Sequence, residues 1–124
     1  MYLVGAPHPH KIEAQLLLER LVTSGQRLVT DAEVMQEILH RYTAIGRRAA
    51  IRPAFQLVLD IADDILAIEK MDVLRAGEIV QTRALLSARA GIHIAVMERY
   101  GIRSILSFDA DFDQWPGLKR IHRI

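Results

Sequence analysis

The stretch Leu86–Phe112, LSARAGIHIAVMERYGIRSILSFDADF, decides the fold. Between Ile92 and Met97 apolar side chains point to different faces of one predicted helix, which is typical of a helix buried inside a domain. Gly101 ends this helix, at a position where a left-handed backbone conformation is easily adopted. A short predicted strand, Arg103–Phe108, follows directly.

Three acidic residues follow the predicted strand: Asp109, Asp111 and Asp113. In parallel α/β sheets, functional sites form at the carboxyl ends of the strands. Carboxylate oxygens are the ligands that hard divalent cations such as magnesium prefer. The stretch therefore predicts a helix, a strand and an acidic site in that order.

The composition predicts a single domain over residues 1–124 with enough apolar residues for a core, since 51% of the chain is hydrophobic. The sequence has no run of 18 apolar residues, no signal-peptide pattern at its start and no cysteine, so we expect a cytoplasmic protein without a membrane span. The net charge of +1 excludes a strongly basic nucleic-acid binder. The densest basic group, Arg47, Arg48 and Arg52, is either a solvated helix face or a phosphate contact surface.

Short predicted strands alternate with helices along the chain, which indicates a parallel sheet covered on both faces. Thr30 and Glu33 match a capping-box pattern at the start of the second helix. The predicted helices cover about 10–23, 31–46, 48–62, 72–86 and 88–100. The predicted strands cover about 28–30, 65–68, 103–108 and 119–122.

The order of these elements and three short motifs resemble a PIN-domain ribonuclease of the VapC toxin family. The motifs read Ala88-Arg89-Ala90, Ile92-His93-Ile94-Ala95 and Ser107-Phe108-Asp109. The resemblance implies a three-layer α/β/α fold with a short parallel sheet. It also implies a toxin that is a Mg²⁺- or Mn²⁺-dependent endoribonuclease, with RNA as substrate, a cognate antitoxin as partner and a second copy in a homodimer.

The resemblance assigns the metal to carboxylates from distant parts of the chain. Glu37, in Met-Gln-Glu-Ile-Leu, corresponds to the second acid of the family and Asp109 to the fourth, so both are predicted catalytic and metal-binding residues. Asp111 is a predicted additional metal ligand. The alternatives are that Glu37 is a surface acid paired with Arg41, and that Asp109 caps a short helix over residues 110–114.

The chain departs from the family pattern at two places. Ala90 stands where the family carries its third acid, and an alanine cannot bind a cation. The segment Met1-Tyr2-Leu3-Val4-Gly5 corresponds to the start of the family's first helix, so the first strand and its Asp are expected to be largely absent, through truncation or a misassigned start. Both departures predict a nuclease that is inactive or very weak.

Two other functions remain open. A PIN-like domain without cleavage activity would engage an antitoxin or RNA as a binding module, whereas an unrelated signalling domain would need a lysine beside a phosphorylatable Asp, for which Lys70 is the candidate. His93 on its apolar helix is read as a core histidine and Glu33 as a capping residue. A calcium loop beginning at Asp109 is excluded, because Gln114 and Arg120 occupy the positions that need Gly and Glu.

Overall fold

The computed structural model describes residues 1–4, 19–20, 23–107 and 109–121. The predicted first helix, about 10–23, therefore falls almost entirely outside the described residues. Five parallel strands form one sheet in the order β3-β2-β1-β4-β5. The strands are β1 (Tyr2–Leu3), β2 (Val29–Asp31), β3 (Asp64–Leu66), β4 (Ser104–Leu106) and β5 (Lys119–Ile121).

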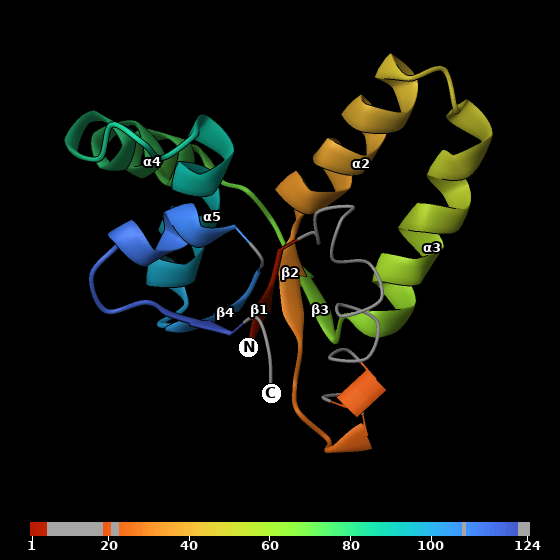
Figure 1. Ribbon diagram of the computed structural model, residues 1–124, viewed down its shortest axis with the longest axis horizontal. Coiled ribbons are helices and arrows are strands. Elements are labelled where there is room, and N and C mark those ends of the chain that lie inside the picture. Colours follow the sequence, from red (N-terminus) through yellow and green to blue (C-terminus); the bar gives the residue numbers. More distant parts are fainter. Residues whose placement is uncertain (5–18, 21–22, 108, 122–124) are drawn as a thin grey trace.

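Helices flank the sheet on both sides (Figure 1). The helices α2 (Ala32–Ala44) and α3 (Ile51–Ile61) lie together beside β2 and β3, with a 3-10 turn, η2 (Arg48–Ala50), between them. The helices α4 (Lys70–Thr82) and α5 (Ala88–Arg99) pack extensively against each other on the other side. A second 3-10 helix, η3 (Ala110–Gln114), follows β4. The predicted α/β fold with a short parallel sheet is confirmed.

The expectation that the first strand is largely absent is wrong, because Tyr2–Leu3 forms the central strand. Tyr2 is aligned with Val29 of β2 on one side and with Ile105 of β4 on the other. The N–H of Val29 donates to the carbonyl of Met1 at 2.9 Å, and the N–H of Val4 donates to Leu106 at 3.2 Å. Two residues suffice as a strand here, since neighbours on both edges satisfy the backbone.

The core confirms that α5 is an internal helix. Its residues 93–97 are all buried, and they pack under the sheet with Tyr2, Ile105 and Phe112. Gly91 marks the closest approach to α4, because an added Cβ would lie 2.8 Å from Val80 Cγ1 and 3.2 Å from the Ala76 carbonyl oxygen. No described helix is both long and apolar enough to cross a membrane.

Three predicted boundaries moved for identifiable reasons. Asp31, not Thr30, caps α2, because the Thr30 hydroxyl donates at 2.6 Å to the carbonyl of Leu3 inside the sheet. The helix α4 begins at Lys70 because Glu69 and Asp72 form a reciprocal capping box. The predicted helix 48–62 divides into η2 and α3.

Candidate functional site

The predicted acids lie beyond the carboxyl ends of two strands. Glu37 is in the second turn of α2, which continues directly from β2. Asp109 follows β4, and Asp111 is the second residue of η3. The strands β2 and β4 are parallel and lie on either side of β1. These acids therefore lie at the same edge of the sheet, the one formed by the carboxyl ends of the strands.

A fourth carboxylate at this edge, Asp31, is completely buried at the end of β2. Its Oδ1 accepts from the N–H of Val34 at 3.1 Å, which caps α2. Its Oδ2 accepts from the hydroxyl of Tyr2 and lies 2.7 Å from His93 Nδ1. From the sequence, Asp31 was predicted only as a residue that could start the second helix, and not as a site residue.

His93 joins Asp31 to Glu37. Its ring is 1% exposed, with Nδ1 against Asp31 and Nε2 3.2 Å from Oε1 of Glu37. The prediction of a core histidine is therefore confirmed, but its ring also reaches the predicted site acid. The described residues thus contain a continuous chain of side chains from Tyr2 through Asp31 and His93 to Glu37.

The two carboxylates beside His93 favour the positively charged form of its ring. Burial alone lowers the pKa of His93, but the hydrogen bonds and negative charges of Asp31 and Glu37 outweigh it and raise the pKa to about 9. At neutral pH both ring nitrogens of His93 therefore donate. Burial, followed by the negative charge of Asp31, raises the pKa of Tyr2 above its ordinary value, which keeps its hydroxyl protonated.

Glu37 is partly accessible, with 24% of its side chain exposed. Its Oε1 is also 3.8 Å from Nε of Arg89, whose side chain is 55% exposed. The alternative in which Glu37 pairs with Arg41 is wrong for the described residues, whose ion pairs join Glu37 to Arg89 and His93 instead. Among the described residues, the side-chain hydrogen bond to Glu37 is the one that His93 Nε2 makes with Oε1.

Glu33 lies one helical turn before Glu37. Burial raises its pKa, while the charge of His93 opposes the rise. The predicted capping role of Glu33 is wrong, because the cap of α2 is the Asp31 side chain.

Asp109 is a helix cap, as one of the two interpretations predicts. Its Oδ1 accepts from the N–H of Asp111 at 2.9 Å, and its own N–H donates at 3.1 Å to the buried Ser107 hydroxyl. Asp111 is exposed, and Asp113 forms an ion pair with Arg120 at 2.9 Å. The capping contact occupies Oδ1 of Asp109, so a metal role for Asp109 remains a prediction.

Ala90 lies in the first turn of α5, where it is 3% exposed. Its N–H donates to the Ser87 hydroxyl, which caps the helix. The methyl group belongs to the core cluster and offers no oxygen to the site. Across residues 1–4, 19–20, 23–107 and 109–121, no three His, Asp or Glu side chains converge closely enough to hold a metal ion.

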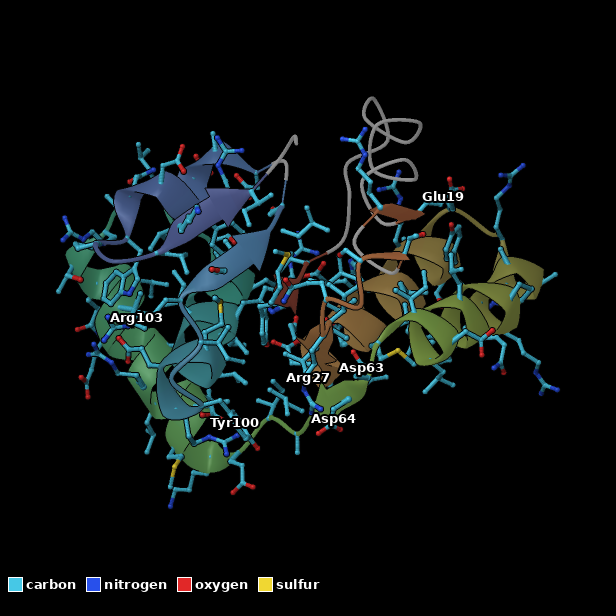
Figure 2. The ribbon with its side chains drawn as sticks, turned by 90° about the horizontal axis from the view of Figure 1, so that it is seen from below. Glu19, Arg27, Asp63, Asp64, Tyr100 and Arg103 are labelled. Carbon is cyan, nitrogen blue, oxygen red and sulfur yellow. The ribbon has the colours of Figure 1, made fainter. Side chains whose placement is uncertain are left out.

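The opposite edge of the sheet carries a separate charged group. The Asp63 carboxylate accepts at 2.8 Å from the N–H of Leu28, and the terminal amine of Met1 donates at 3.0 Å to the carbonyl of Arg27. Figure 2, viewed from this side, shows Arg27, Asp63 and Asp64 near one another.

The basic residues Arg47, Arg48 and Arg52 are all exposed around the start of α3.

Asp31 and His93 are the site residues that sequence reasoning missed. Asp31 follows an apolar strand, a position where the other acids were noticed. A histidine between Ile92 and Ile94 on a buried helix requires a polar partner from another element. That requirement was available from the sequence, but the identity of the partner depends on the tertiary fold.

Comparison with known proteins agrees with this architecture. A model of the PIN domain matches residues 1–118. VapC ribonuclease Mb1869c of Mycobacterium bovis and Ribonuclease VapC13 of Mycobacterium tuberculosis are each 54% identical over 121 residues, which cover 98% of this chain and 92% of each relative. Ribonuclease VapC23 of M. tuberculosis is 37% identical over 109 residues, covering 88% of this chain and 86% of that protein.

Two solved structures share the fold at low sequence identity. One is VapBC2 from Rickettsia felis bound to a DNA fragment from their promoter, with a TM-score of 0.66, 10% identity and coverage of 97% of this chain and 96% of that one. The other is a toxin-antitoxin complex from Klebsiella pneumoniae, with a TM-score of 0.63, 14% identity and full coverage of both chains.

Proposed function

Since the chain belongs to the PIN-domain family, we propose that it is the toxin component of a toxin–antitoxin pair and a metal-dependent endoribonuclease that cleaves cellular RNA in the cytoplasm. The observation that carries the proposal is 54% identity, over nearly the whole chain, to relatives named as VapC ribonucleases. The partly exposed carboxylate of Glu37 beyond β2 supports it, because PIN-type chemistry needs acids at this edge.

Glu37 and Asp109, with Asp111, are the residues that would hold the metal ion. Their oxygen donors suit Mg²⁺ or Mn²⁺, and the described side-chain hydrogen bond to Glu37 is made at Oε1. When bound, a divalent ion activates water and stabilises the charge that develops on the phosphate. The three carboxylates would bind and orient the ion.

The same site supports the proposal that catalysis is impaired. The position of the third family acid is a buried methyl group, Ala90, and one oxygen of Glu37 faces two cationic side chains. A divalent ion would therefore have few ligands and would meet a carboxylate whose charge is already partly neutralised. Both effects weaken binding of the ion.

A binding module that engages an antitoxin or RNA without cutting is the second candidate. The observation that favours it is the pairing of Glu37 with His93 and Arg89, which satisfies the acid without any ion. A PIN domain stabilised in this way would keep the surfaces that bind its partners but would not cleave RNA.

An antitoxin and a second copy of the chain are the proposed protein partners. Large apolar side chains are exposed on α3, where Leu57 and Leu59 are 59% and 53% exposed, and on α2, where Leu39 is 47% exposed. Exposed apolar groups on neighbouring helices are typical of protein–protein contact surfaces. The sequence also predicts apolar helix faces around Leu16–Leu21 and Ile51–Leu59 as an interface, of which the first lies largely outside the described residues.

Cleavage of a mixed RNA pool in the presence of Mg²⁺ or Mn²⁺ tests the nuclease. We expect weak or no cleavage from this chain, and metal-dependent cleavage from Ala90→Asp, which restores the third family acid. Glu37→Ala should abolish whatever activity is present, whereas Glu78→Gln, an exposed acid on α4, should not change it. Inactivity of Ala90→Asp would leave the binding module as the function.

A further inference from the structure

Positive charge is concentrated on the hairpin that α2 and α3 form. Residues 38–59 include neither aspartate nor glutamate, although the net charge of the whole chain is only +1. The arginines of this segment are Arg41, Arg47, Arg48 and Arg52, and all of them are exposed. The remainder of the chain is therefore net acidic, and this hairpin is the part of it that suits a polyanion.

The four arginines of the hairpin have no partner within the described part of the chain. None of their side chains makes a hydrogen bond or an ion pair there, whereas arginines elsewhere in the fold pair with carboxylates. Glu37, one helical turn before Arg41, contacts Arg89 and His93 instead. The guanidinium groups of the hairpin are consequently available to an anion from outside the chain.

The turn that carries Arg47 and Arg48 does not depend on their side chains. The N–H of Arg47 donates at 2.8 Å to the carbonyl of Tyr42, and the N–H of Ala50 donates at 3.0 Å to the carbonyl of Arg47. Gly46 adopts a φ of +71°, which reverses the direction of the chain. The Arg47 side chain does not cap η2. Substitutions at these arginines therefore leave the contacts that shape the turn in place.

The basic residues extend from the site edge of the sheet along α2. Arg41 lies on the same face of the helix as Glu37, because residues four apart are neighbours on a helix surface. The end of α2 at Ala44 lies about 10 Å beyond Glu37, from the helical rise per residue. Figure 1 shows α2 and α3 running side by side away from the sheet, with the turn between them at the far end. The arginines thus follow one direction outward from the site edge.

We propose that Arg41, Arg47 and Arg48 are a phosphate track, which binds the backbone of a single RNA strand that extends from the site edge along α2. A guanidinium group donates two parallel N–H bonds that match the oxygens of a phosphate. Such contacts hold and orient a nucleic acid without reading its sequence. The inference rests on the proposed RNA substrate, and the track needs no bound metal ion.

A protein is the other macromolecule that could contact this hairpin. The exposed Leu39 suits a protein partner, but it points away from the track. Residues two apart on a helix differ in direction by about 200°, so Leu39 lies nearly opposite Glu37 and Arg41. The charged face and this apolar side chain therefore serve different partners, and the charged face favours RNA.

Fluorescence anisotropy with a labelled single-stranded RNA tests the track, in EDTA so that the strand is not cleaved. The track variant combines Arg41→Gln, Arg47→Gln and Arg48→Gln. A second variant with lysine at the same three positions keeps the charge, and it should bind RNA nearly as well as the parent because the electrostatic contribution of a phosphate contact requires only a cation.

The control variant combines Arg27→Gln, Arg103→Gln and Lys119→Gln. These residues are exposed and lie near the amino ends of β2, β4 and β5, at the edge of the sheet opposite the predicted site. The control thus removes the same charge from the protein as the track variant does, but at a distance from α2. Its RNA affinity should stay close to that of the parent.

We expect the track variant to bind RNA roughly 10-fold more weakly than the parent, and the slope of log affinity against log salt to fall by about 2, as the loss of three phosphate contacts to a single strand predicts. Unchanged binding by the track variant would overturn the track and leave the hairpin to a protein partner. Equal weakening in the control variant would also overturn it, by showing a general effect of charge. A parent that binds no RNA would instead overturn the proposed substrate, so the two failures are distinguishable.

Discussion

Arg99 and Asp72 form a double ion pair between the end of α5 and the beginning of α4. Nε of Arg99 lies 2.9 Å from Oδ1 of Asp72, and Nη2 lies 2.9 Å from Oδ2. The same Nη2 donates at 3.1 Å to the carbonyl of Ala67, and Asp72 also accepts from the N–H of Glu69 at 2.8 Å. Since Asp72 is 2% exposed, this pair is one of the buried polar contacts that define how the two helices meet.

Arg99→Met should strongly destabilise the fold, because it leaves the Asp72 carboxylate buried without its cation. Urea denaturation measures the loss in the free energy of unfolding, which should exceed the loss caused by removing a more exposed arginine. Arg75→Met is the matched control, since Arg75 forms a more exposed ion pair with Glu98 at 2.9 Å. Its loss should stay within about 1 kcal/mol; equal losses in the two variants would contradict this account.

Stability should fall in acid partly through Asp72. The hydrogen bond from Arg99 holds the pKa of Asp72 below its ordinary value of 3.8. A carboxyl whose pKa is lowered by folding stabilises the folded state above the unfolded pKa and stops doing so as the pH falls through the folded pKa. Urea denaturation at pH values from about 5 down to about 2 should therefore show a smaller acid-induced loss in Asp72→Asn than in the parent.

Ser87→Ala should lower stability by about 1 kcal/mol, because the Ser87 hydroxyl caps α5 by accepting from the N–H of Ala90 at 3.1 Å. Ser87→Asn should retain most of the stability, since asparagine is also a good capping residue. Thermal denaturation followed by circular dichroism measures both. A loss in Ser87→Asn as large as that in Ser87→Ala would show that the cap is not the reason.

The aromatic ring of Tyr2 should be essential for the stability of the fold, whereas its hydroxyl should contribute much less. Tyr2→Ala removes a completely buried ring from the central strand, so we expect a loss of about 3–5 kcal/mol, as for other buried aromatic residues. Tyr2→Phe removes only the hydrogen bond to Asp31, which keeps its bonds to Val34 and His93. A loss of about 1 kcal/mol is expected, and equal losses in chemical denaturation would contradict the structural role of the ring.

Much of the fold was predictable because its signals are local. The apolar segment of α5, the glycine at 101 that adopts φ of +67°, and the strand that follows it are all encoded in adjacent residues. The motif Met-Gln-Glu-Ile-Leu also identified Glu37, whose side chain lies near the edge of the sheet where the site was predicted. These features depend on periodicity and turn chemistry, which act over a few residues.

The errors concern contacts between distant segments. Tyr2–Leu3 is too short to be predicted as a strand from its own residues, and it is one because β2 and β4 bond to it from both sides. Asp31 caps α2 because Thr30 is already bonded inside the sheet. The partnership of Asp31 with His93 joins residues 62 positions apart, which no local pattern reveals.

The position of β1 also determines when the sheet can close during synthesis. Of the described strands, the first to be synthesised is the middle strand of the sheet, and its partner Ile105 belongs to β4, which follows β2 and β3 in the sequence. Until β4 emerges, one edge of β1 has no described strand to pair with, and pairings between such distant segments form slowly. The nascent chain must therefore extend through β4 before the buried Tyr2 can be enclosed and the carboxyl-terminal edge of the sheet beside it can be assembled.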